Sequence, residues 1–287
     1  MADLDPDDPV VKLVLQGLKE RVERADAHEE LRASPEYREI LARTNRSVAG
    51  LLRTLHLCDL AASQWTEYSN EYLFPRHQDD IGEAILVAQL AIENGGLNAA
   101  RRELRHALEV AVNTLYVDEA AAAEDLDGKV KFFRGKKVNK ANADHIRDLR
   151  LRMLGEDREA FVLVTHQAWV DASNYVHLTK RRMDEKLRLR AEGVRLGLET
   201  PAMLASVADE LHLVCCIVVI LAFEGIGPSL TADILVGWLD ADDTWPFHDN
   251  PFIAAVDSHF DYKHERQATL AEHALRRSKR ISSGGRD

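Results

Sequence analysis

The chain has 287 residues, of which 46% are hydrophobic and 30% are charged, so it can bury a sizeable core. Its formal net charge of −11 excludes a protein that binds nucleic acid over its whole surface, because phosphate binding requires an excess of Lys and Arg. Only 15 Gly and 8 Pro occur, and Ala, Leu, Glu and Arg dominate the rest, a composition typical of helices. We therefore predict an all-α fold: a multi-helix bundle with long helices.

The first third of the chain carries two helix-start signals. Pro9 opens an apolar repeat that continues to Leu18, with Pro near the first turn of the helix. Ser34 and Pro35 then stand at the N-cap and first position of a second helix, which we expect to run to about residue 68. These acidic N-terminal helices are interpreted as a dimer arm or a sensor.

Glycine clusters separate the helices that follow. The sequence "NGG" at 94–96 is a C-cap signal, and "GIGP" at 225–228 is a helix breaker. Further helices are expected over about 78–94, 98–124, 157–192, 201–224, 229–239 and 250–277. We predict three regions: N-terminal helices at 1–73, a helical core at 74–195, and C-terminal helices with a disordered tail at 196–287.

The cysteines and apolar segments indicate a cytoplasmic protein. Three Cys, with Cys215 and Cys216 adjacent, do not form a disulfide framework and are expected in the core. The acidic N-terminus lacks the basic and apolar segments of a signal peptide. The longest apolar run, 213–223, is shorter than the ~20 residues that span a bilayer. We therefore expect a buried helix there and no membrane partner.

The stretch "RRELRHALEVAVNTLY" at 101–116 has two distinct faces. Projected at about 100° per residue, its apolar flank faces a core, and a polar line runs beside it. The apolar flank consists of Leu104, Leu108, Ala111 and Leu115, and the polar line of Arg105, Glu109, Asn113 and Tyr116. Arg105 and Glu109 are spaced as an i,i+4 ion pair. The line is either a structural seam against another helix or the wall of a catalytic cleft.

Two Arg/His pairs are secondary candidates for catalysis. Arg101 and His106 have a spacing associated with HEPN-type ribonucleases, but about 140° around the helix separates them, so they could converge only on something as large as a dimer cleft. Arg266 and His273 fall on one face of a C-terminal helix that we expect to be exposed.

A second polar line lies on the helix predicted after residue 157. Its apolar stripe is expected to bury Phe161, Ala168, Trp169, Ala172, Tyr175 and Val176. Opposite that stripe stand His166, Ser173, Asn174, His177 and Arg181. His166 and His177 are some 16 Å apart along the axis, so they cannot share a metal ion. His177 is either a general acid/base, oriented by its polar neighbours, or a polar contact between helices.

These two helices together resemble bacterial abortive-infection and DUF5677-like helical proteins, which are grouped loosely with the HEPN superfamily. The resemblance covers about residues 74–185 and depends on Arg105 and Glu109 as an Arg-x3-Glu pair, Tyr116 after it, and "ASNYVH" at 172–177. Active members of that superfamily are dimeric, metal-independent ribonucleases of phage defence and toxin–antitoxin systems. The resemblance implies RNA as substrate, a homodimer, no metal and no cofactor.

In such a ribonuclease, Arg105 would hold the scissile phosphate, with Glu109 beside it, and His177 would move a proton. Asn113, Tyr116, Ser173 and Asn174 would support the site. A basic segment at 128–140, predicted as a loop or short helix, is either an RNA-binding surface or a solvated loop. Its candidate contacts, with Arg181, are Lys129, Lys131, Arg134, Lys136, Lys137 and Lys140, interleaved with Phe132 and Phe133.

Two functions from different classes therefore remain open. The first is an RNA-cleaving, HEPN-like effector that acts as a homodimer. The second is a non-catalytic helical protein that binds and regulates a protein or nucleic-acid partner. The acidic segment 239–250 lacks the ordered spacing of a calcium loop and is expected to be a solvated turn.

Overall fold

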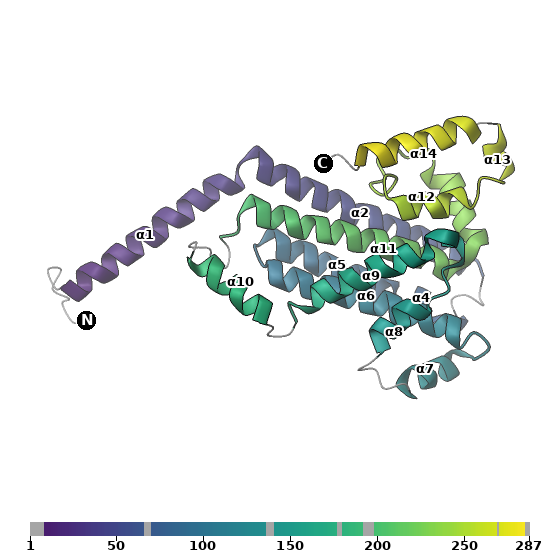
Figure 1. The fold of residues 1–287 in the computed structure, drawn as a ribbon, viewed down its shortest axis with the longest axis horizontal. Coiled ribbons are helices and arrows are strands. Elements are labelled where there is room, and N and C mark those ends of the chain that lie inside the picture. The colour runs from purple at the N-terminus through teal and green to yellow at the C-terminus, as the bar shows by residue number, and fades with distance from the viewer. Residues whose placement is uncertain are drawn as a thin grey trace.

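The computed structural model describes residues 9–65, 70–135, 141–176, 180–191, 198–268 and 270–284. Throughout these ranges the regular structure is helical and no strand occurs, so the all-α prediction is confirmed (Figure 1). The long helices are α1 (Pro9–Arg32), α2 (Pro35–Ser63), α5 (Gln78–Glu93), α6 (Leu97–Ala120), α9 (Arg158–Ser173) and α11 (Pro201–Ile234). The shorter elements are α4 (Leu73–Arg76), α7 (Leu126–Gly135), α8 (Ala141–Asp148), η2 (Arg152–Asp157), α10 (Lys180–Ala191), η3 (Leu235–Leu239), α12 (Pro251–Ser258), α13 (His264–Gln267) and α14 (Leu270–Gly284).

Helix α11 is the centre of the bundle, where it packs against α2, α5 and α6 (Figure 1). Its residues 214–223 are buried on every side, as expected of a helix that is apolar all round. The stretch Pro201–Leu239 is long and apolar enough to cross a membrane, and 61% of its most apolar window is buried inside the protein. One hydrophobic cluster joins side chains of α2, α6 and α11, and so draws on all three predicted regions.

Local signals set the starts of α2 and α11. The Ser34 side chain accepts a hydrogen bond from the Tyr37 N–H (3.2 Å), and Pro35 follows it, as predicted. Thr200 caps α11 in the same way, by accepting from the Met203 N–H (3.3 Å). The predicted helix break at "GIGP" is confirmed: Gly227 takes a positive φ of 80°, outside the helical range, and a second helical stretch runs from this kink to Ile234 and on into η3.

Two predicted boundaries differ from the structure. The helix expected over 157–192 ends at Ser173, turns through residues 174–176, and resumes at Lys180 as α10. The C-terminal helix expected over 250–277 is three separate helices, α12, α13 and α14. The basic segment begins as α7, whereas residues 136–140 lie outside the described part of the chain.

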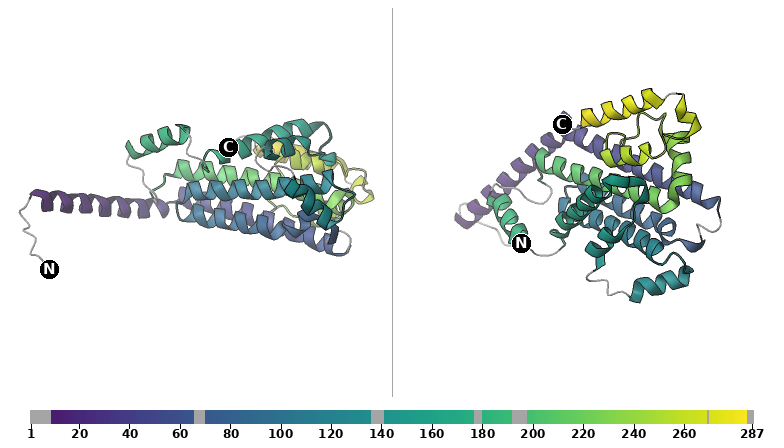
Figure 2. Two further views of the ribbon diagram at one scale, coloured as in Figure 1. Left: turned by 90° about the horizontal axis from the view of Figure 1, so that it is seen from below. Right: turned by 45° about the vertical axis from the view of Figure 1, so that its right-hand side comes forward.

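Helix α1 projects from the bundle as a long arm (Figures 1 and 2). Its root is held in place: His28 Nε2 lies 3.0 Å from the Glu199 carbonyl oxygen, and Arg32 donates to the Glu93 carbonyl oxygen. Beyond this root, Leu15, Leu18 and Val22 are each at least half exposed. Among the described residues, the bundle contacts this arm at its root, and an apolar stripe is exposed on the rest of the helix.

Candidate functional site

Helices α6 and α9 pack against each other, and the polar line of α6 lies partly in their contact. The apolar flank of α6 is buried as predicted, with Leu104, Leu108, Ala111 and Leu115 in the core. The predicted ion pair is also present, with Arg105 Nε donating to Glu109 Oε1 at 2.7 Å. The α6 helix is thus oriented by its apolar residues so that this pair faces α9.

Trp169 of α9 completes the Arg105–Glu109 pair. Its indole Nε1–H donates to Glu109 Oε1 (3.0 Å), and the Arg105 guanidinium carbon lies 5.4 Å from the centre of its ring. Trp169 was expected inside the apolar stripe of α9, but it is half-buried and contacts both the core and the polar pair. We call Arg105, Glu109 and Trp169 together the α6–α9 seam. The glutamate therefore accepts from two donors and holds both the arginine and the tryptophan.

The other half of the polar line meets α8 instead of α9. Asn113 Oδ1 lies 2.7 Å from His145 Nδ1, and the buried Tyr116 ring stacks on His145 with 4.0 Å between ring centres. Sequence reasoning did not select His145, which is 32 residues from Asn113. Asn113 and Tyr116, 8 and 11 residues after Arg105, thus make a polar contact with α8 that is separate from the Arg105–Glu109 pair.

The first turns of α6 contact the C-terminal end of α9. Arg101 forms a two-pronged ion pair with Glu210 of α11, with Nε and Nη2 each 2.6 Å from a carboxylate oxygen, and its guanidinium covers the Tyr175 ring at 4.2 Å. Arg102 Nε donates to the Tyr175 carbonyl oxygen (3.1 Å). The "ASNYVH" element therefore does reach the Arg-rich end of α6, through Tyr175.

The structure separates Arg101 from His106, as the helix geometry predicted. Arg101 is buried and His106 is exposed, and they lie on different faces of α6. On α9, Ser173 Oγ donates to the Trp169 carbonyl oxygen (2.6 Å), and Asn174 is half-buried just beyond the helix. Val176, expected in the core, is 39% exposed.

The described residues do not include every predicted contact. His177, Lys136, Lys137 and Lys140 lie outside them, and the Arg181 side chain is likewise not described.

Over its described residues, 128–135, the basic segment does not present a continuous basic surface. Lys131 and Arg134 are exposed on α7, but Lys129 is 1% exposed and points into the protein. Its Nζ lies 3.2 Å from Asp118 Oδ1 and donates to the Glu71 carbonyl oxygen at 2.6 Å. The assignment of Lys129 to a nucleic-acid surface is therefore wrong. Phe132 and Phe133 are also not splayed for base stacking, because both pack against the core.

Arg105 has a nitrogen atom without a hydrogen-bond partner among the described residues. Arg105 Nη1 is buried and makes no hydrogen bond to any residue that the structure describes, although the side chain as a whole is 16% exposed. A buried charged N–H group is costly when left unpaired, so its position indicates a place for an acceptor. An anion beside the Trp169 ring would supply one.

No family model, curated protein or solved structure matches the chain. The three cysteines lie in the core as predicted, and burial raises the pKa of the Cys58, Cys215 and Cys216 thiols well above the usual range, so none supplies a thiolate nucleophile.

Proposed function

We propose that the chain is a HEPN-like effector that binds RNA at the α6–α9 seam and cleaves it, with Arg105 as the residue that holds the scissile phosphate. The observation that carries this proposal is the unpaired, buried Nη1 of Arg105. Glu109 fixes the guanidinium from one side through Nε, and the Trp169 ring lies beside it. The Nη1 group is thus pre-oriented for a phosphate oxygen, an acceptor that guanidinium groups bind strongly.

Each residue of the seam has a separate role in this proposal. Arg105 stabilises the charge that develops on the phosphate, and Glu109 is a positioning residue, because its Oε1 is already occupied by Arg105 and Trp169. In the reaction that the resemblance implies, the ribose 2′-oxygen attacks phosphorus and the bond to the 5′-oxygen breaks. His177, assigned from the sequence, would take the first proton or return one to the leaving oxygen.

A non-catalytic regulator is the second candidate, and a specific observation favours it. Glu109 and Asn113 both have internal partners, so the described part of the seam offers a phosphate contact but no carboxylate poised as a base. Such a seam would bind RNA and leave it intact. The two candidates therefore make the same prediction for binding and opposite predictions for cleavage.

The Arg105→Ala variant tests the phosphate contact. Charge-assisted hydrogen bonds contribute about 1.5–3 kcal/mol, so we expect single-stranded RNA to bind roughly 10- to 100-fold more weakly and any cleavage to fall by at least as much. Arg46→Ala, which removes an exposed arginine of α2, is the matched control and should change neither. Binding is measured by fluorescence anisotropy and cleavage on gels of single-stranded and transfer RNA, with circular dichroism to verify folding.

The outcomes separate the candidates. Cleavage that Arg105→Ala abolishes supports the ribonuclease, whereas binding without cleavage supports the regulator. If the wild-type chain does not bind RNA, or if Arg105→Ala binds it as well as Arg46→Ala does, the proposed phosphate contact is wrong.

We propose further that two copies of the chain pair through α1. The arm carries an apolar stripe that includes Leu15, Leu18 and Val22, and a second copy offers an identical stripe. Its two halves differ slightly in charge. Lys12 and Lys19 outnumber Glu20 in the N-terminal half, whereas four acidic residues outnumber three arginines in the half near the root: Glu23, Asp26, Glu29 and Glu30 against Arg21, Arg24 and Arg32. An antiparallel pair brings the basic half of each helix beside the acidic end of the other, which favours a second copy as the occupant.

A double substitution in the stripe should abolish the dimer. Leu15→Glu with Leu18→Glu places four like charges in the paired interface, so we expect a monomer at micromolar concentration by light scattering after size-exclusion chromatography. Leu13→Glu is the matched control, because Leu13 is 70% exposed and lies on the opposite side of α1. It should remain a dimer; a monomeric wild-type chain, or a double variant that still dimerises, would refute the pairing.

A further inference from the structure

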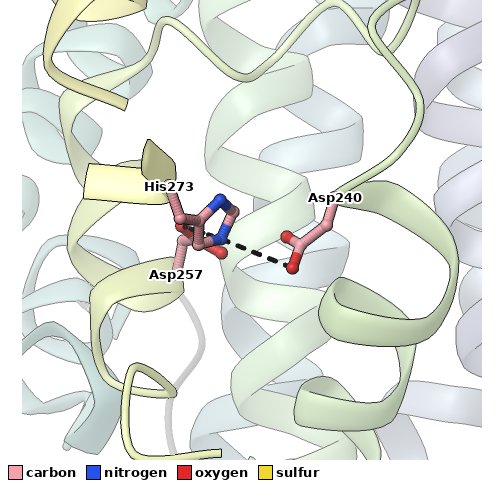
Figure 3. Close-up of side chains that lie close together, drawn as sticks. All are labelled: Asp240, Asp257 and His273. Carbon is pink, nitrogen blue, oxygen red and sulfur yellow. Dashed lines mark ion pairs between the residues drawn. The ribbon is translucent and has the colours of Figure 1, made fainter. Parts of the chain in front are cut away.

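A cluster of charged side chains lies where η3, α12 and α14 meet (Figure 3). Asp240 follows η3, Asp257 belongs to α12 and His273 to α14. The sequence predicted a solvated acidic turn for Asp240 and an exposed helix for Arg266 and His273. Both predictions are wrong, since Asp240 is partly buried in this cluster and the two basic residues are only 3% and 7% exposed.

The two carboxylates and the imidazole converge on one point. The Nε2 atom of His273 lies 3.4 Å from Asp240 Oδ2 and 3.8 Å from Asp257 Oδ2. One ligand-type atom from each residue falls within 4.8 Å of the others. His273 Nε2 is buried and makes no hydrogen bond to any residue in the described part of the chain. The ring nitrogen is thus aimed between two carboxylate oxygens without a bond to either.

Two arginines bind the carboxylates, including the Oδ2 atoms that face His273. Arg266 donates to both oxygens of Asp240 (2.9 and 2.7 Å) and to Asp257 Oδ1 (2.5 Å). Arg277 donates to Asp257 Oδ2 (2.7 Å) and to Asp261. Metal-binding carboxylates are commonly held by such outer partners, which fix their orientation. The oxygens that face His273 are therefore pre-positioned.

The charge of the cluster favours a cation. Three carboxylates, from Asp240, Asp257 and Asp261, oppose two guanidinium groups, which leaves one net negative charge. Histidine binds metal ions through the lone pair of a ring nitrogen, and His273 Nε2 makes no hydrogen bond to the described residues.

We infer that Asp240, Asp257 and His273 form a binding site for a divalent transition metal ion, of which Zn²⁺ fits the donor set best. Imidazole nitrogen and carboxylate oxygen are both regular zinc ligands, and three protein ligands leave a fourth position. A small cavity adjoins the cluster and is lined by Leu235, Trp245, His248 and Ile253, where a water molecule or substrate group would complete the coordination. The ion would join α14 to α12 and to the end of η3.

The test is Zn²⁺ binding by the full chain without an affinity tag, after chelator treatment and dialysis. We expect one equivalent of Zn²⁺ by calorimetry and a higher melting temperature when it is bound. Loss of an outer partner weakens metal binding by about 10- to 100-fold, so loss of a ligand in His273→Ala or Asp257→Asn should weaken it by more than 100-fold. Asp261→Asn, which removes a carboxylate of the same cluster but no ligand, should retain the stoichiometry and lose less affinity.

A second measurement covers the case in which a ligand variant does not fold. Co²⁺ bound to the wild-type chain should show the intense visible absorption of a four-coordinate site, and added Zn²⁺ should abolish it. The inference is overturned if the wild-type chain binds no stoichiometric Zn²⁺, if bound Co²⁺ shows only the weak spectrum of the hydrated ion, or if a folded His273→Ala binds Zn²⁺ as tightly as the wild type.

Discussion

Replacing Asp118 by Asn is expected to lower the free energy of unfolding by about 3–5 kcal/mol, the cost of leaving one charge of a buried pair without its partner. The carboxylate lies in the core, 3.2 Å from the ammonium group of Lys129. It also accepts from the backbone N–H groups of Leu73 (2.9 Å) and Phe74 (2.8 Å), and so caps α4. Burial raises the pKa of Asp118, while these N–H groups and Lys129 act in the opposite direction.

Urea denaturation at neutral pH measures this effect. Lys131→Met, on the same helix as Lys129 but exposed, is the control and should change stability by less than about 0.5 kcal/mol. The double variant Asp118→Asn/Lys129→Met removes both charges and should regain part of the loss, because no unpaired charge remains buried. A loss below about 1 kcal/mol in Asp118→Asn would show that the pair does not support the fold.

Glu224 should make the stability of the protein depend on pH. Burial raises its pKa to about 7, and the charge of Glu119 adds to this, although the N–H groups of Met153 and Arg152 oppose it. Because the folded pKa lies above the ordinary value of 4.5, the folded state holds the proton more tightly. The stabilising contribution is complete below about pH 4.5 and is lost as the pH rises through about 7.

Glu224→Gln should remove this contribution to the pH dependence. We expect the difference in unfolding free energy between wild type and variant to change by on the order of 3 kcal/mol between pH 4 and pH 8.5, in favour of the variant at high pH. Glu83→Gln, at an exposed glutamate of α5, should track the wild type at every pH. Parallel profiles for wild type and Glu224→Gln would mean that Glu224 titrates near its ordinary pKa.

The sequence predicts the parts of the fold that local signals determine. Ser34 and Pro35 define the start of α2 because capping and proline geometry act within one helical turn. The Arg105–Glu109 pair follows from i,i+4 spacing for the same reason. By contrast, no Gly or Pro marks the end of α9 at Ser173. The residues just beyond this end contact distant parts of the chain, for example through the hydrogen bond from Arg102 to the Tyr175 carbonyl oxygen.

Long-range partners were beyond prediction from spacing. Glu210 binds Arg101 across 109 residues, and the Asp240–His273 cluster joins three separate elements. The burial of Lys129, however, had a readable signal. Lys129 shares one helix face with Leu126, Val130 and Phe133, at i−3, i+1 and i+4. These apolar neighbours indicate that the Lys129 side chain points into the protein, but the basic composition of the segment favoured a surface position instead.

The anchored root of α1 affects how a dimer paired through α1 would bind RNA. The 24 residues of the arm extend about 36 Å, and the contacts of His28 and Arg32 hold it in a fixed direction. An antiparallel pair would then hold two bundles at opposite ends of a stiff spacer, each with its own complete Arg105 seam. A long RNA that reaches both seams would bind with avidity, because the first contact raises the effective concentration for the second, whereas a short one would engage a single bundle.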